Sequence, residues 1–255
     1  LLARRASRRR RPDHTGDRRV LTSRRPRRSP YDGGMQRRSP APPLWAFIPY
    51  ITVSAIHVAL LALESPAAGA SKLLLMPLLA IPVVVSTRAI RSRAAVVLLL
   101  LAIVFSWLGD SAGALFTDAP EVPLMLLFFG IAHVAYIALF IRHLGVRRMP
   151  WWALIYVGWW IAMLALLGPH TGGLLIAVAV YGLILGATAA FSARCHPLIA
   201  VGGAFFLTSD TLLALRLFLP GSLPGWSNPA IMATYTIGQG LIIAGALIAL
   251  RKRDT

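Results

Sequence analysis

Two aspartates stand inside long apolar stretches of this 255-residue chain, and they are the residues best suited to chemistry. Asp110 lies in VFSWLGDSAGAL at 104–115, and Asp210 lies in AFFLTSDTLLAL at 204–215. A charged side chain costs roughly 2.5–3.5 kcal/mol at the centre of a membrane helix, so it faces the bundle interior and marks a functional site by default. The two acids fall at similar depths on different segments, and they could share one pocket for acid–base chemistry or proton transfer.

Other polar residues recur at helical spacing and extend the candidate site. Taken singly, a tyrosine, glutamine or histidine in a membrane helix is more often a packed, hydrogen-bonded residue than a catalyst. Arg216, six residues after Asp210, could be a structural partner or simply reach the interface. His57 has no evident partner, so we expect it to be structural or interfacial. The candidates besides the two acids are Lys72, His133, Tyr136, Tyr181, Ser209, Tyr235 and Gln239.

The composition indicates an integral membrane protein. Hydrophobic residues make up 57% of the chain and charged residues 14%, whereas a soluble domain has about 45–50% and about 25%. The net charge of +17 is typical of a nucleic-acid-binding protein, but fourteen arginines fall in residues 1–43. We therefore expect no nucleic-acid partner. A single cysteine, Cys195, excludes an intramolecular disulfide framework, and we expect no metal site.

The basic segment 1–43 forms a region of its own. Its Arg, Pro, Ser and Gly content with few large apolar residues predicts disorder. It lacks the apolar core of a signal peptide, and Met35 is an alternative translation start. Its arginines could contact anionic lipid at the inner leaflet, or the segment could be a solvated tail. The membrane domain is then 44–250, followed by a cytoplasmic tail at 251–255.

Eight apolar segments are long enough to cross a bilayer core of roughly 30 Å. With the N-terminus inside, the cytoplasmic segments hold 24 of the 26 lysines and arginines, as the positive-inside rule requires. The pattern predicts an all-α bundle of eight transmembrane helices with both termini cytoplasmic, in a cell membrane. We expect Pro77 and Pro82 to kink the second helix. The expected spans are 44–63, 72–87, 94–116, 122–141, 151–168, 172–191, 197–219 and 229–250.

Five short motifs occur in order along these spans: SKLLLMP at 71–77, WLGD at 107–110, HVAY at 133–136, GAFFLTSDTLLA at 203–214 and YTIGQ at 235–239. Together they resemble the YhhN-like family of polytopic membrane proteins, whose animal members are lysoplasmalogenases. The resemblance covers about residues 45–250. It implies an eight-helix fold and hydrolysis of the vinyl ether bond of lysoplasmalogens, releasing a fatty aldehyde. The motif positions that it carries over are Lys72, Asp110, His133, Tyr136, Ser209, Asp210, Tyr235 and Gln239.

Vinyl ether hydrolysis needs an acid that protonates carbon, an anion near the resulting cation, and one water. Two carboxyl groups in different environments supply this, as they do in glycoside hydrolysis, with no cofactor. We expect Asp110 and Asp210 to be the acid and the base or stabiliser, in either order. The other candidates would orient water and the acids, and Lys72 would hold the phosphate of a lysophospholipid. A proton-coupled transporter or a lipid-binding membrane protein could use the same buried acids. The Arg-, Ala- and Pro-rich composition is typical of a GC-rich genome. This favours a bacterial source, and hence the inner membrane as the location.

Overall fold

A computed structural model describes residues 44–253, and every regular element in that range is a helix. A π-helical turn, Phe140–Leu144, continues α5, and short 3-10 turns flank several other helices. The predicted basic region at 1–43 and the last two residues lie outside the described residues. The α-helices are α1 (Ile48–Ala62), α2 (Ala68–Ser86), α3 (Arg93–Asp110), α4 (Ala112–Leu115), α5 (Glu121–Leu139), α6 (Ile155–Leu167), α7 (Leu175–Ser192), α8 (Pro197–Phe218) and α9 (Ser227–Arg253).

Eight of these helices, with their adjoining turns, are long and apolar enough to cross a membrane. In hydrocarbon every backbone N–H and C=O needs an internal partner, so long apolar segments fold as helices. The predicted class, an all-α bundle of eight membrane helices, is therefore confirmed for residues 44–253. The side of the membrane on which the termini lie stays a prediction.

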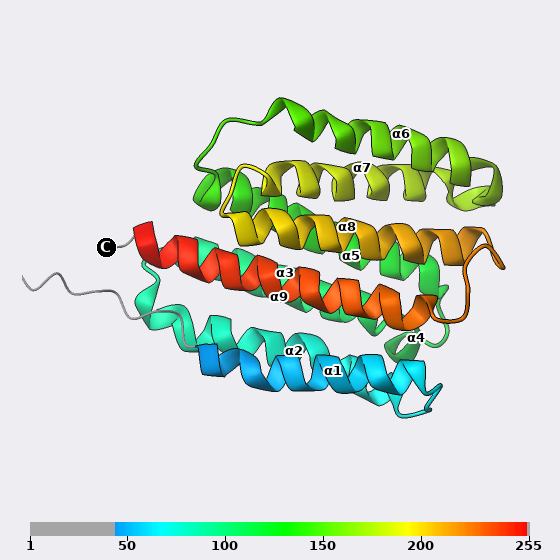
Figure 1. The fold of residues 1–255 in the computed structure, drawn as a ribbon, viewed down its shortest axis with the longest axis horizontal. Helices are drawn as coiled ribbons and strands as arrows, with labels where there is room; N and C mark the ends of the chain where they lie inside the picture. The colour runs from blue at the N-terminus through cyan, green and yellow to red at the C-terminus, as the bar shows by residue number, and fades with distance from the viewer. Residues whose placement is uncertain (1–43, 254–255) are drawn as a thin grey trace, which may run out of the picture. The chain divides into compact units, whose positions relative to one another are not determined.

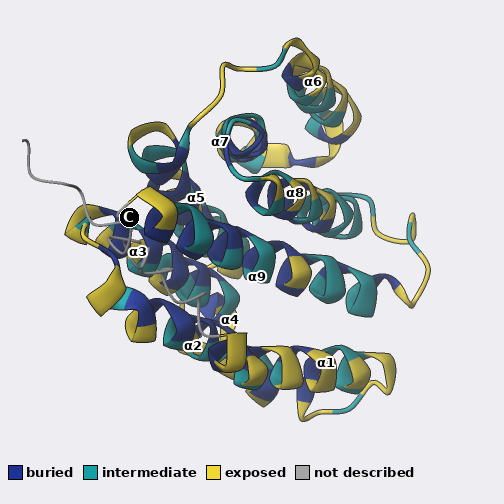
Figure 2. Ribbon diagram, turned by 60° about the vertical axis from the view of Figure 1, so that its left-hand side comes forward, coloured by how far each residue is buried: buried dark blue, intermediate teal, exposed yellow. Residues whose placement is uncertain are grey.

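The helices of this domain run roughly along one direction, and neighbours in the chain mostly pack together (Figure 1). The α1–α2 pair lies at one side and α6 at the other, with α3, α5, α8 and α9 between them. The most extensive contact joins α8 to α9, followed by that of α3 with α5. Buried residues concentrate in this central group, and α9 is the most buried span, whereas α6 is the least buried (Figure 2).

Glycines let α8 and α9 approach closely. A Cβ atom on Gly202 would lie 2.8 Å from the carbonyl oxygen of Gly238, and a Cβ on Gly238 would lie 2.9 Å from the amide nitrogen of Phe206. Small residues at such crossings are the usual means by which membrane helices pack. Because α9 carries Tyr235 and Gln239, this contact sets where those two side chains lie.

Two boundaries differ from the expected spans in ways that affect the site. The second span begins at Ala68, so Lys72 lies one turn inside α2 rather than at its first residue. The helix α2 continues through Pro77 and Pro82 without interruption. The third span ends at Asp110 instead of 116, because the chain turns at Ser111 and the short helix α4 packs against α5.

Candidate functional site

The two aspartates face one cavity of about 180 Å³, which we call the acid cavity. Asp110 reaches it from the last residue of α3, and Asp210 from the middle of α8. Lys72, Ser209, Tyr235 and a third carboxylate, Glu121, also line it, and apolar side chains of α5, α8 and α9 form the remaining wall. A water molecule occupies about 30 Å³ of liquid, so the space accepts a small reacting group with water beside it.

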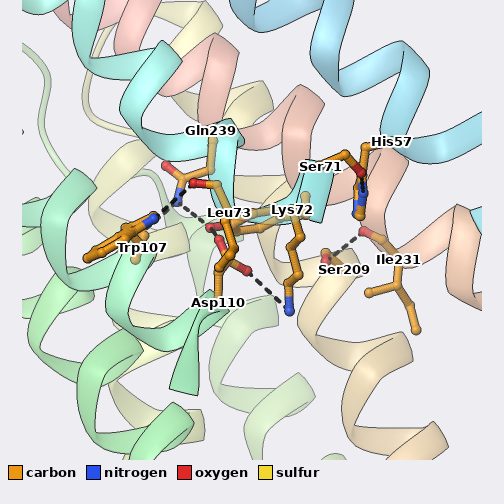
Figure 3. A network of polar contacts seen from close by, with 11 residues as sticks. His57, Ser71, Lys72, Leu73, Trp107, Asp110, Ser209, Ile231 and Gln239 are labelled. Atoms are coloured by element: carbon orange, nitrogen blue, oxygen red, sulfur yellow. Dashed lines mark hydrogen bonds and ion pairs between the residues drawn. The ribbon is translucent and has the colours of Figure 1, made fainter. Parts of the chain in front are cut away.

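Asp110 is held by a cation and a phenol. The Lys72 Nζ lies 3.6 Å from Asp110 Oδ1, and the Asp110 side chain is 4% exposed, whereas that of Lys72 is 35% exposed (Figure 3). The Tyr235 hydroxyl donates a hydrogen bond to Asp110 Oδ2 over 2.7 Å. The Trp107 indole N–H donates to the Leu73 carbonyl at 2.9 Å and thereby ties α3 to α2 beside this ion pair.

Asp210 has a different partner. The Tyr181 hydroxyl of α7 donates a hydrogen bond to Asp210 Oδ2. Arg216, weighed as a structural partner of Asp210, instead donates from Nη1 to the Ser227 hydroxyl at 2.8 Å. The two acids therefore share a cavity but differ in environment. Asp110 has an ion pair with a lysine and a hydrogen bond from a phenol, whereas Asp210 has a hydrogen bond from a phenol alone.

A buried hydrogen-bond network extends from the Asp110 side of the cavity. The Tyr136 hydroxyl donates to Gln239 Oε1 at 2.5 Å, and Gln239 Nε2 donates to Ser106 Oγ at 3.0 Å. The same amide nitrogen lies 3.5 Å from the Tyr235 hydroxyl, which contacts Asp110. The network fixes the orientation of Tyr235, because its members come from three different helices and are all buried.

Ser209 and His133 take other positions. The Ser209 hydroxyl donates to the Ile231 carbonyl at 2.9 Å, so it links α8 to α9 while lining the acid cavity. His133 is buried, but it is not among the residues that line this cavity. Its ring packs edge-on against Phe206 with centroids 4.7 Å apart, and neither ring nitrogen has a partner within the described part of the chain. The same ring contacts Tyr181, the residue that bonds Asp210.

His57 is a residue that sequence reasoning missed. It was expected to have no partner, but its Nδ1 lies 2.8 Å from the hydroxyl of Ser71 on α2. His57 also lines a second cavity, which borders the acid cavity at Lys72. The sequence places His57 and Ser71 on either side of the short α1–α2 turn, where two membrane helices must face each other. This arrangement could have predicted the pairing.

Residues 44–253 contain no group of three or more His, Cys, Asp or Glu side chains that could hold a metal ion. The expectation of a reaction without metal stays a prediction. The arrangement offers three carboxyl groups, those of Asp110, Glu121 and Asp210, with one ammonium and two phenols around a small, mostly apolar space. This is suited to moving protons to and from an otherwise apolar ligand.

Comparison with known proteins gives a family but no closer relative. Neither a curated protein nor a solved structure matches the chain. The model of the YhhN family matches residues 67–246, a stretch that contains Lys72, both aspartates and every residue of the network described above. The chain is therefore a member of the YhhN family.

Proposed function

We propose that this protein hydrolyses the vinyl ether bond of a lysoplasmalogen-type lysolipid. The observation that carries the proposal is the meeting of Asp110 and Asp210 at one small cavity, with different partners on each acid. Membership of the YhhN family is consistent with this activity. The proposed setting is a bacterial cell membrane, with the single-chain lipid entering from the bilayer.

The reaction is an acid-catalysed hydration followed by cleavage. A proton adds to the β-carbon of R–CH=CH–O–R′, and the electron pair of the double bond forms the new C–H bond. The resulting oxocarbenium ion takes up water, and loss of a proton gives a hemiacetal. Collapse of the hemiacetal yields R–CH₂–CHO and HO–R′, where R′ is the glycerophospho-alcohol. The site must therefore supply an acid, stabilise a cation and hold one water.

The partners of the two aspartates divide these roles. The Lys72 ammonium compensates the negative charge of Asp110, so we assign Asp110 as the carboxylate that stabilises the oxocarbenium ion and accepts the proton from water. Asp210 is bonded to the neutral Tyr181 phenol in a mostly apolar wall, and we assign it as the acid. Glycosidases use a pair of carboxyl groups in the same division of labour.

The remaining residues hold these two groups in place. Tyr181 and Tyr235 each fix one carboxyl oxygen, and Gln239 with Tyr136 holds Tyr235. Packing of His133 against the Tyr181 ring gives it a positioning role rather than contact with the lipid. Lys72 is one-third exposed and keeps N–H donors for a phosphate group, which a lysine binds as a point charge.

Isotope incorporation by purified protein in detergent tests the proposal. In D₂O with immediate borohydride trapping, we expect one deuterium at the carbon next to the former aldehyde. In oxygen-18 water, the glycerol oxygen should stay unlabelled, because the vinyl C–O bond is the one broken.

We expect D210N to lose about 10²–10⁴-fold in kcat, with D110N also impaired and D118N, at an exposed acid outside the cavity, unchanged. Wild-type rates in both D110N and D210N would refute the assignment.

A proton-coupled carrier is the second candidate. The observation that favours it is the row of contacts from Tyr136 through Gln239 and Tyr235 to Asp110, since such rows can relay protons. A carrier needs sealed vesicles and a gradient, whereas a hydrolase works in detergent. Solute uptake by proteoliposomes that depends on a pH gradient, without aldehyde release in detergent, would favour the carrier.

A further inference from the structure

A second cavity, of about 240 Å³, adjoins the acid cavity at the end of the bundle where α1 ends and α2 and α9 begin. Lys72, Leu213, Ile231 and Met232 line both cavities, so the two spaces meet at the Lys72 side chain. The polar lining residues of the second cavity are His57, Lys72 and Asn228, and none of its lining residues is a carboxylate. We call this space the His57 cavity.

The hydrogen bonds of His57 fix which ring nitrogen carries a proton. The Ser71 hydroxyl has one proton, which it donates to the Ala68 carbonyl at 2.9 Å. Its oxygen must therefore accept from His57 Nδ1–H at 2.8 Å. The imidazole is 1% exposed and shares its cavity with the Lys72 ammonium, so a second positive charge there is disfavoured. Neutral His57 then presents Nε2 as a hydrogen-bond acceptor.

That acceptor has no protein partner in the described residues. His57 Nε2 is a buried atom without a hydrogen bond, although the ring lines the cavity. Buried polar atoms usually have partners, and an unmade bond of this kind costs free energy. Figure 3 shows the His57 and Lys72 side chains extending the same way from their helices. A ligand group in this cavity would meet the Lys72 cation, and the unpartnered Nε2 belongs to a ring that forms part of the same wall.

We propose that the His57 cavity binds the polar end of the lysolipid, with His57 Nε2 accepting a hydrogen bond from it. The inference rests on the proposed function, which supplies the lipid class. Lys72 faces the phosphate, and the Asn228 amide supplies a further donor within the same cavity. The group that donates to Nε2 carries an O–H or N–H, and a lysolipid has two such sources: the free glycerol hydroxyl and a primary ammonium of the headgroup.

Binding of saturated alkyl-ether lysolipids tests the site without requiring hydrolysis. Three probes separate the sources: the ethanolamine lipid has both donors, the choline lipid lacks the N–H donor, and the 2-O-methyl ethanolamine lipid lacks the hydroxyl. In H57F the acceptor is lost, and we expect about tenfold weaker binding of every probe that carries the donor in question. H57Q, whose amide oxygen can replace Nε2, should retain most of the affinity, and H170F, at an exposed histidine, should match the wild type.

Each outcome decides the matter. Loss in H57F for both ethanolamine probes but not the choline probe identifies the ammonium, and loss for both 2-hydroxyl probes identifies the hydroxyl. Equal loss for all three probes in H57F and H57Q, or no loss in either variant, would overturn the proposal. If the wild type binds in the expected pattern but releases no aldehyde from the vinyl ether, the site stands and the hydrolase does not. If the wild type releases aldehyde while H57F binds like the wild type, the hydrolase stands and the His57 site does not.

Discussion

The Lys72 ammonium lies 3.6 Å from the Asp110 carboxylate, and the same side chain lines both the acid cavity and the His57 cavity. Lys72 extends from α2 and Asp110 terminates α3, so two neighbouring helices supply the pair. Asp210, which lines the same acid cavity, accepts a hydrogen bond from a phenol instead. One lysine thus makes two chemically identical side chains unequal, and the proposed function gives the same lysine the contact with the lipid phosphate.

Replacing Lys72 with methionine should impair binding of the lipid phosphate more than folding. Methionine keeps the length and apolar stem but removes the charge, so Asp110 loses its cation and the phosphate loses its contact. Because the lysine is partly exposed, we expect an effect of about tenfold on KM with a smaller fall in kcat. Steady-state kinetics of K72M, K72R and the control K252M, at the far end of α9, would check this. Unchanged KM in K72M would contradict it.

The substitution Gly238→Ala should destabilise the protein, whereas Gly158→Ala should not. A Cβ on Gly238 would lie 2.9 Å from Phe206 N and 3.0 Å from Gly202 O, and these backbone atoms cannot move aside as a flexible side chain can. Overpacking of this kind costs about 1–3 kcal/mol. A Cβ on Gly158 meets no atom within 4 Å, so G158A is the matched control. Thermal unfolding in detergent should show a lower Tm for G238A alone. The activity of G238A should also fall, because displacement of α9 would move Tyr235 away from Asp110.

The sequence predicted the fold and singled out the two aspartates as candidates, because both inferences follow from simple costs. Eight spans follow from the lengths of apolar stretches, and Asp110 and Asp210 stand out because a carboxylate is unfavourable in hydrocarbon. Pairings were harder to predict. The contact of Lys72 with Asp110 depends on α2 beginning at Ala68 and on α3 ending at Asp110, and apolar flanking residues mark neither boundary.

Tyr181 and His57 show why the rest could not be predicted. Tyr181 reaches Asp210 only because α7 packs on α8, and a single sequence does not specify which helices are neighbours. His57 appeared isolated because Ser71, its partner, lies across a turn in the next helix. His133 belongs to one of the sequence motifs, but its ring packs against aromatic side chains and does not line the acid cavity.

Cys195 should react slowly with thiol reagents in the folded protein. It lies in the turn between α7 and α8, where burial raises the pKa of the thiol to about 11 despite the nearby Arg194 and Arg253. At pH 8 only about a thousandth of such thiols are ionised, against roughly a quarter for an exposed thiol. The alkylation rate should therefore rise about tenfold per pH unit between pH 7 and 9 and be far faster after unfolding in SDS. A native rate equal to the unfolded rate would contradict the burial of this thiol.

The end of the bundle that carries Lys72 should face the outside of the cell. Apart from Lys72 and Arg216, all lysines and arginines of residues 44–253 lie at the opposite end, in the α2–α3, α5–α6 and α7–α8 connections and at the end of α9. Arg253, for example, donates hydrogen bonds to the carbonyls of His143 and Gly145 at that end. The positive-inside rule then makes that end cytoplasmic.

Cysteine labelling with a membrane-impermeant maleimide would check this orientation. In a C195A background, S222C lies at an exposed position of the α8–α9 connection and R148C at an exposed position between α5 and α6. We expect S222C to be labelled in intact spheroplasts and R148C only after permeabilisation. The reverse pattern would place the acid cavity and the His57 cavity toward the cytoplasm, and the lipid would then have to reach them from the inner leaflet. Labelling of both in intact spheroplasts would indicate mixed insertion, which the charge asymmetry opposes.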